Sequence, residues 1–110
     1  MGVHELASLL QQRRLSGKLY LEFLRVPSLS VGLYELPAGG ADPQQPHTED
    51  EVYYVIQGRG MIQVAGQDQP VLPGSAVFVG AGVPHHFHSI TADLTLLVFF
   101  APAEGGRTGK

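Results

Sequence analysis

Three residues near the middle of the chain have the types and the spacing of a metal-binding group. Gln45, His47 and Glu51 all occupy odd positions, and alternate side chains of an extended strand project from the same face. An imidazole, a carboxylate and an amide oxygen on one face can bind a divalent ion. Tyr53 continues this face inward, so its ring is a candidate wall of a binding pocket.

A second group of potential ligands follows later, in the run VPHHFHSI. In a strand, His85 and Phe87 share one face while His86 and His88 share the other. If this strand lines the same barrel as the first group, one of the three histidines can join the earlier histidine and glutamate. Two imidazoles and one carboxylate are the ligand set of non-heme Fe(II) sites, which leave positions open for substrate and dioxygen.

The same residues also have simpler interpretations. His86 and His88 are most simply surface residues, because histidines are often exposed or hydrogen-bonded. Glu49 and Asp50 are most simply solvated turn residues, although Glu49 shares the parity of Glu51 and could replace it as a ligand. The histidines and the glutamate of the proposed site could instead form a buried hydrogen-bonded cluster without a metal.

The composition restricts both the fold and the partners. The chain has 110 residues, 44% hydrophobic and 15% charged, with 14 Gly, 8 Pro and no Cys. This apolar content predicts one globular domain rather than a disordered chain, and the lack of Cys excludes thiol catalysis and Cys-ligated metals. A net charge of −3 without a basic cluster argues against nucleic acid as a partner. Since the apolar runs are far shorter than the roughly 20 residues of a membrane span, we expect a cytoplasmic protein without a membrane partner.

Local patterns give the order of the elements. Apolar residues at helical spacing predict one short helix in residues 3–14, within an N-terminal helical segment of residues 1–18. From residue 19 onward, short runs rich in Leu, Val, Ile, Tyr and Phe are closed by Gly or Pro, as in strands. Turn glycines that recur every eight residues predict an all-β barrel or sandwich: Gly58, Gly66, Gly74 and Gly82.

The remaining segments set the limits of the domain. Residues 37–46, PAGGADPQQP, form one long irregular connection. We place the barrel in residues 19–102 and expect a flexible C-terminal tail in residues 103–110, where the sequence EGGRTGK has no apolar pattern.

In its first motif the sequence resembles the cupin superfamily, whose members are small jelly-roll β-barrels of six to eight strands. The family pattern G-x5-H-x-H-x3-E-x6-G is followed from Gly39 to Gly58, through His47 and Glu51. Gln45 stands where the pattern has its first His. Four of the five positions of the pattern therefore match.

The second cupin motif, G-x5-P-x-G-x2-H-x3-N, follows after a short connection typical of compact bacterial single-domain cupins. Gly74, Gly82 and His85 match it, while Gly80 stands for the Pro and Ser89 for the Asn. The resemblance covers roughly residues 30–101, and the pair of motifs is more specific than either one alone.

The resemblance implies a metal site made of Gln45, His47, Glu51 and His85. The ion would be one divalent transition metal, either Fe, Mn, Ni, Co or Zn. An amide oxygen is a poorer donor than imidazole for such metals, so Gln45 either coordinates weakly or leaves an extra position for water. A kink at the proline that follows could present Gln44 instead.

We therefore expect an all-β protein, a single jelly-roll cupin barrel with a short N-terminal helix. It would bind or act on a small organic molecule beside the metal, with Tyr53 and Phe87 in the pocket wall. A non-heme dioxygenase is the leading enzyme hypothesis, and a metal-dependent isomerase or decarboxylase is the second. The competing hypothesis is a non-catalytic module that binds or senses a small ligand. Apolar residues in excess of simple alternation in residues 19–26 and 94–101 predict a homodimer.

Overall fold

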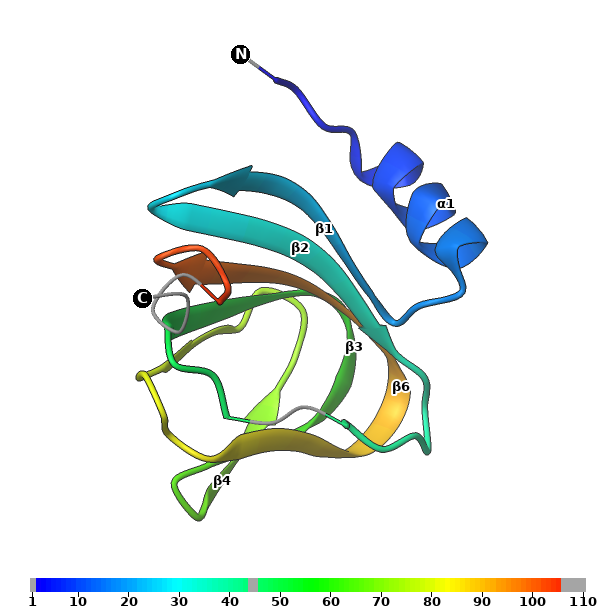
Figure 1. Ribbon diagram of the computed structural model, residues 1–110. Helices are drawn as coiled ribbons and strands as arrows, with labels where there is room; N and C mark the ends of the chain where they lie inside the picture. The colour runs from blue at the N-terminus through cyan, green and yellow to red at the C-terminus, as the bar shows by residue number, and fades with distance from the viewer. Residues whose placement is uncertain (1, 44–45, 106–110) are drawn as a thin grey trace.

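The computed structural model describes residues 2–43 and 46–105 of the chain. One helix and six strands form the fold, and all strand pairs are antiparallel. The sheet order is β1-β2-β6-β3-β4, with β5 paired to β3, and the strands curve around a common interior (Figure 1). The expected all-β jelly-roll with one short helix is confirmed. The elements are α1 (Leu6–Ser16), β1 (Tyr20–Val26), β2 (Leu29–Leu36), β3 (Asp50–Val64), β4 (Gln67–Val71), β5 (Ala76–Val79) and β6 (His85–Ala101).

Helix α1 lies along the outer side of β1 and β2 (Figure 1). It buries Leu9 and ends at Ser16, and it is capped by Gly17, which has a left-handed backbone and donates its N–H to the carbonyl of Arg14. The Arg13 guanidinium donates from Nε to Glu35 Oε1 at 2.7 Å. Within the described part of the chain, no helix is long and apolar enough to cross a membrane.

The two longest strands are β3 and β6, and each joins two short apolar runs that look like separate strands in the sequence. The expectation of a turn at Gly58 is wrong, because this residue lies inside β3 where the pairing with β6 shifts register. Its φ is +102°, and a Cβ there would come within 2.2 Å of the Asp93 carbonyl oxygen. Gly58 therefore permits a close approach of two bent strands.

The other three glycines of the eight-residue pattern do lie at turns. Gly66, Gly74 and Gly82 all have positive φ and follow or precede the short strands β4 and β5. The pattern missed β4 itself, whose sequence QDQPV is polar and exposed up to its last residue, Val71. A short polar strand of this kind at a sheet edge has no apolar period to detect.

One hydrophobic core fills the interior of the curved sheet. Odd-numbered residues at the start of β3 and even-numbered residues at the end of β6 point inward, as strand alternation requires. The core also takes residues from the other strands. Its members are Tyr34, Leu36, Tyr53, Val55, Ile62, Val71, Val79, Phe87, Ile90, Leu94, Leu96, Val98 and Phe100.

Candidate functional site

Glu51 and His85, two of the ligands that the resemblance implies, meet in the interior. Glu51 is paired with Val79 of β5, and the chain returns from β5 through a turn directly to His85, the first residue of β6. The His85 Nε2 atom lies 3.1 Å from Glu51 Oε1, and both side chains are buried. The β5–β6 turn thus places one predicted ligand against another.

The backbone holds the His85 ring in one orientation. His85 Nδ1 lies 2.9 Å from the Val83 carbonyl oxygen, which can only accept a hydrogen bond. Nδ1 therefore carries the hydrogen, and Nε2 faces Glu51 and the Tyr53 hydroxyl, the latter at 3.0 Å. Histidines that bind a metal through one ring nitrogen usually donate a hydrogen bond from the other ring nitrogen.

Opposing influences act on the protonation of this ring. Burial lowers the pKa of His85, but the Glu51 carboxylate, the Val83 carbonyl and Asp42 together outweigh it and raise the pKa above the usual histidine value. The pocket around Nε2 therefore attracts positive charge.

Glu51 is the least satisfied polar group of the interior. Its side chain is 1% exposed, and neither carboxylate oxygen has a hydrogen-bond partner among the described residues. The 3.1 Å contact with His85 does not change this while Nε2 is unprotonated, because both atoms are then acceptors. A buried carboxylate needs a compensating cation or proton. Two donors of one metal ion at a right angle are about 3.0 Å apart when each bond is about 2.1 Å, so the pair fits two ligand positions.

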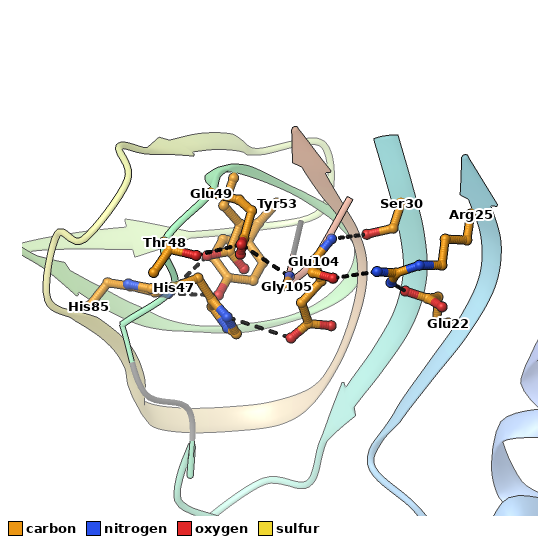
Figure 2. Close-up of polar contacts among 11 residues, drawn as sticks. Glu22, Arg25, Ser30, His47, Thr48, Glu49, Tyr53, His85, Glu104 and Gly105 are labelled. Carbon is orange, nitrogen blue, oxygen red and sulfur yellow. Dashed lines mark hydrogen bonds and ion pairs between the residues drawn. The ribbon is translucent and has the colours of Figure 1, made fainter. Parts of the chain in front are cut away.

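His47 reaches the site from the loop before β3, not from a strand as the parity argument assumes. Its ring centroid is 6.3 Å from that of His85 and 4.7 Å from that of Phe100. Its Nδ1 atom is 3.5 Å from Glu104 Oε2 (Figure 2). His47 is therefore a neighbour of the Glu51–His85 pair but is turned toward the C-terminal segment.

The predicted four-ligand set is only partly visible. Gln45 and its alternative Gln44 lie outside the described residues. Among the residues that are described, no group of three or more His, Asp or Glu side chains is arranged to hold a metal ion. The assignment of Gln45, His47, Glu51 and His85 as a metal site thus remains a prediction.

The expectation that Glu49 is a solvated turn residue is wrong. Glu49 is 2% exposed, and its Oε2 atom accepts hydrogen bonds from the Thr48 hydroxyl and from the backbone N–H of Gly105 (Figure 2). Its carboxylate ties the loop before β3 to the end of the chain. The Asp50 carboxylate stabilises the turn between β5 and β6 by accepting the Ala81 N–H at 2.9 Å.

Residues 103–105, which the sequence analysis assigned to the tail, pack against the barrel. Ala103 is buried, and the Glu104 N–H donates to Ser30 Oγ at 2.9 Å. The Arg25 guanidinium donates to the Glu104 carbonyl at 2.7 Å (Figure 2). The Glu104 carboxyl reaches His47, and burial, followed by smaller effects of neighbouring carboxylates, raises its pKa despite His47, which lowers it.

A cavity of about 270 Å³ opens beside His47. Neither Glu51 nor His85 is among its lining residues, but the wall includes His47 and Phe100, the cross-strand neighbour of Glu51. The lining residues are Leu19, Tyr20, Tyr34, Pro43, His47, Phe100 and Glu104. A small organic molecule of matching size can occupy such a cavity.

The loop that carries His47 is fixed at its first half by Asp42. The Tyr34 hydroxyl donates to Asp42 Oδ1 at 2.7 Å, and the Phe87 N–H donates to Asp42 Oδ2 at 3.0 Å. Burial and then this hydrogen bond raise the pKa of Tyr34 well above its usual range. Asp42 therefore holds the loop against β2 and β6.

The remaining predicted residues are divided between interior and surface. Tyr53 and Phe87 are fully buried and stack edge to face behind the Glu51–His85 pair, with ring centroids 4.9 Å apart. Neither belongs to the lining of the cavity beside His47. His86 is exposed and His88 is half-buried beside Asp68, 2.8 Å away, so both face away from the core as expected.

Sequence reasoning missed several residues of the cavity wall. Tyr20, Tyr34 and Phe100 were recognised only as apolar strand positions, and their approach depends on the pairing of β1, β2 and β6. Glu104 had no signal at all, since it follows the last apolar run in a Gly-rich end. Only its contacts with distant residues reveal its position.

Comparisons with known proteins agree with the architecture. Residues 32–100 match the family model described as a cupin domain. The uncharacterized protein SCO3923 of Streptomyces coelicolor is 47% identical over 104 residues, which cover 94% of this chain and 99% of that protein.

Solved structures give the same picture of the fold. TT1209 from Thermus thermophilus has a TM-score of 0.74 and 25% identity, covering 94% of this chain and 99% of that chain. KdgF from Halomonas sp. has a TM-score of 0.69 and 20% identity over 76% of both chains.

Proposed function

Because this chain belongs to the cupin domain family, we propose that it binds a small organic molecule beside a divalent metal ion held by Glu51, His85 and His47. The observation that carries the proposal is the Glu51 carboxylate, buried and without a hydrogen-bond donor among the described residues, opposite the Nε2 atom of His85. A cation at this point supplies the compensation that the carboxylate lacks.

The residues around the pair have distinct roles in this proposal. Val83 keeps the His85 tautomer that presents Nε2 to the site. Tyr53 closes the inner side and excludes water, while the cavity beside His47 admits the ligand. When bound, a divalent metal supplies Lewis-acid chemistry and, for Fe(II), reaction with dioxygen. Gln45 remains a candidate fourth ligand.

Dioxygenation is the reaction we place first, because two imidazoles and a carboxylate leave adjacent coordination positions open. Isomerisation or decarboxylation is the second reaction class. The alternative is a non-catalytic module that binds or senses the ligand in the same cavity.

Metal content tests the proposal directly. The protein is purified without a histidine tag, stripped with a chelator, reloaded with Fe, Mn, Ni, Co or Zn and measured by elemental mass spectrometry. We expect about one equivalent of one of these metals in the wild type. His85→Gln loses it, whereas His86→Gln, which alters the neighbouring exposed histidine, retains it.

Circular dichroism of both variants checks that the fold is kept. A wild-type protein that takes up no metal contradicts the metal site and favours the hydrogen-bonded cluster. Equal metal content in the two histidine variants refutes the ligand assignment.

We further propose that the protein is a homodimer through the outer face of β5, β3 and β6. Val52 on this face is paired with Phe99 on one side and Phe78 on the other, and Tyr54 is paired with Leu97. Phe78 is 65% exposed and Tyr54 42% exposed. These five side chains are uncharged, so two copies of the face can meet without repulsion. On the outer side of β1, in contrast, lies helix α1 (Figure 1).

A further inference from the structure

The walls of the cavity beside His47 are made largely of aromatic rings. Tyr20 lies 6.0 Å from Tyr34 and 6.4 Å from Phe100, measured between ring centroids, at interplanar angles of 73° and 79°. The rings pack edge to face, and all three residues line the cavity. The Tyr20 ring is fixed against Gly32, where any Cβ would come within 2.4 Å of ring atoms.

The charges around this cavity are predominantly negative. The Glu104 carboxylate forms part of the wall, and Asp42 lies behind Tyr34. Among the described lining residues there is no Lys or Arg. The guanidinium of Arg25, which lies nearby, is bound to Glu22 at 2.9 Å and to the Glu104 carbonyl.

The Tyr20 hydroxyl responds to the same charges. Burial is the main reason that its pKa is raised far above the usual value, and Glu104, Glu22 and Glu51 raise it further against the effect of Arg25. A divalent metal ion on Glu51 would add two positive charges to the three negative charges of Glu51, Glu104 and Asp42 and leave one net negative charge. The potential in the cavity therefore favours a cation over an anion.

We propose that the ligand of this cavity is a small organic cation of the alkylammonium type, held by the aromatic rings of Tyr20, Tyr34 and Phe100 and by the Glu104 carboxylate. Aromatic faces attract a cation within about 6 Å of the ring centroid, most strongly when water is excluded. The carboxylate supplies the counter-charge at the mouth. This inference rests on the proposed function for the location of the ligand and specifies its chemical class.

Choline and its neutral carbon isostere, dimethylbutanol, provide a matched pair of probes. They share a shape and a hydroxyl group and differ in charge. Isothermal titration calorimetry on the metal-loaded full chain should give choline an affinity at least about tenfold higher, equivalent to about 1.4 kcal/mol. Proton NMR should show the choline methyl signals shifted upfield by the rings.

Two substitutions test the two parts of the recognition. Glu104→Gln keeps the size of the side chain and should weaken choline about tenfold while leaving dimethylbutanol unchanged. Asp68→Asn makes the same change in net charge at an exposed residue of β4 and should leave both affinities unchanged. Phe100→Leu should reduce the preference for choline, whereas Phe99→Leu, on the opposite face of β6, should not.

The result that overturns the inference is equal binding of the two probes, or a preference for choline that survives Glu104→Gln. Metal content measured on the same samples separates this failure from that of the proposed function. Metal uptake without a choline preference refutes only the ligand class, and a choline preference without metal uptake refutes only the metal site.

Discussion

At the scale of single residues, the interior of this protein holds a buried carboxylate, that of Glu51, which has no hydrogen-bond partner among the described residues. Strand alternation placed Glu51 and Tyr53 on one inward face and His85 with Phe87 on one face of the later strand, without deciding which histidine points inward, and all four residues are buried. It placed His47 on the strand face of Glu51, but this residue lies in a loop whose path depends on the contacts of Asp42. Alternation identifies faces of strands, whereas loop residues are placed by long-range hydrogen bonds.

The pKa of His85 provides a test of the buried pair. In metal-free protein we expect a pKa above the usual histidine value of about 6.5, because the Glu51 carboxylate favours the imidazolium form despite burial. Glu51→Gln should lower this pKa. Side-chain NMR titration of chelator-treated protein measures both, and an unchanged value in the variant would contradict the coupling.

The raised pKa also fixes the direction of the pH dependence of stability. A folded state that binds the His85 proton more tightly than the unfolded chain gains stability from it. This contribution is fully present below about pH 6.5 and is lost as the pH rises through the higher folded-state pKa. Chemical denaturation of the metal-free protein across this range should show the loss, and Glu51→Gln should reduce it.

At the scale of the elements, the turn between β3 and β4 is strained in a way that can be relieved. Ala65 and Gly66 form a two-residue connection between the paired residues Val64 and Gln67, with φ of 51° and 81°. Such turns favour Asn-Gly. Ala65→Asn should therefore stabilise the fold by about 0.5–1 kcal/mol, seen as a higher Tm.

The following glycine supplies the control for this turn. A Cβ on Gly66 would have no neighbour within 4 Å, so Gly66→Ala adds strain without a clash and should cost about 1 kcal/mol. Two substitutions with equal effects would show that backbone conformation does not govern this turn.

Two arginines of helix α1 contact Glu35 on β2, and we expect Arg13 to hold the helix on the barrel more strongly than Arg14. Arg13 and Glu35 are each 15% exposed and 2.7 Å apart, whereas Arg14 is 64% exposed and 3.7 Å from the same carboxylate. Arg13→Ala should cost about 1–2 kcal/mol, and Arg14→Ala less than about 0.5 kcal/mol. Urea denaturation measures both, and hydrogen exchange of the helix amides should accelerate only in the first.

The lengths of the elements were harder to predict than their existence. Runs of Val, Leu, Tyr and Phe identified most strand positions, but β3 and β6 continue through residues that normally interrupt strands. Gly58 and Ser89 both have positive φ within these strands. Such bends are stabilised by the partner strand, so the sequence around them looks like a turn.

At the scale of the whole molecule, the two sides of the sheet have different tasks. The concave side encloses the polar pair, whereas on the convex side α1 lies mainly along β1 and β2 (Figure 1). Sequence composition predicted an apolar surplus on the first and last long runs. It could not divide that surplus between helix packing and an open face, because that division depends on where α1 lies.

The open face leads to the prediction about oligomeric state. A homodimer through β5, β3 and β6 buries Phe78 and Tyr54, which removes apolar surface from water at about 25 cal/mol per Å². Phe78→Ser combined with Tyr54→Ser should therefore convert a dimer to a monomer in light scattering at tens of micromolar. Leu72→Ser, at a residue that is 46% exposed outside the strands, should leave the dimer intact. A wild-type monomer at this concentration would contradict the proposal, and because the face lies on the opposite side of the sheet from the cavity wall, metal and choline binding should persist in the monomeric variant.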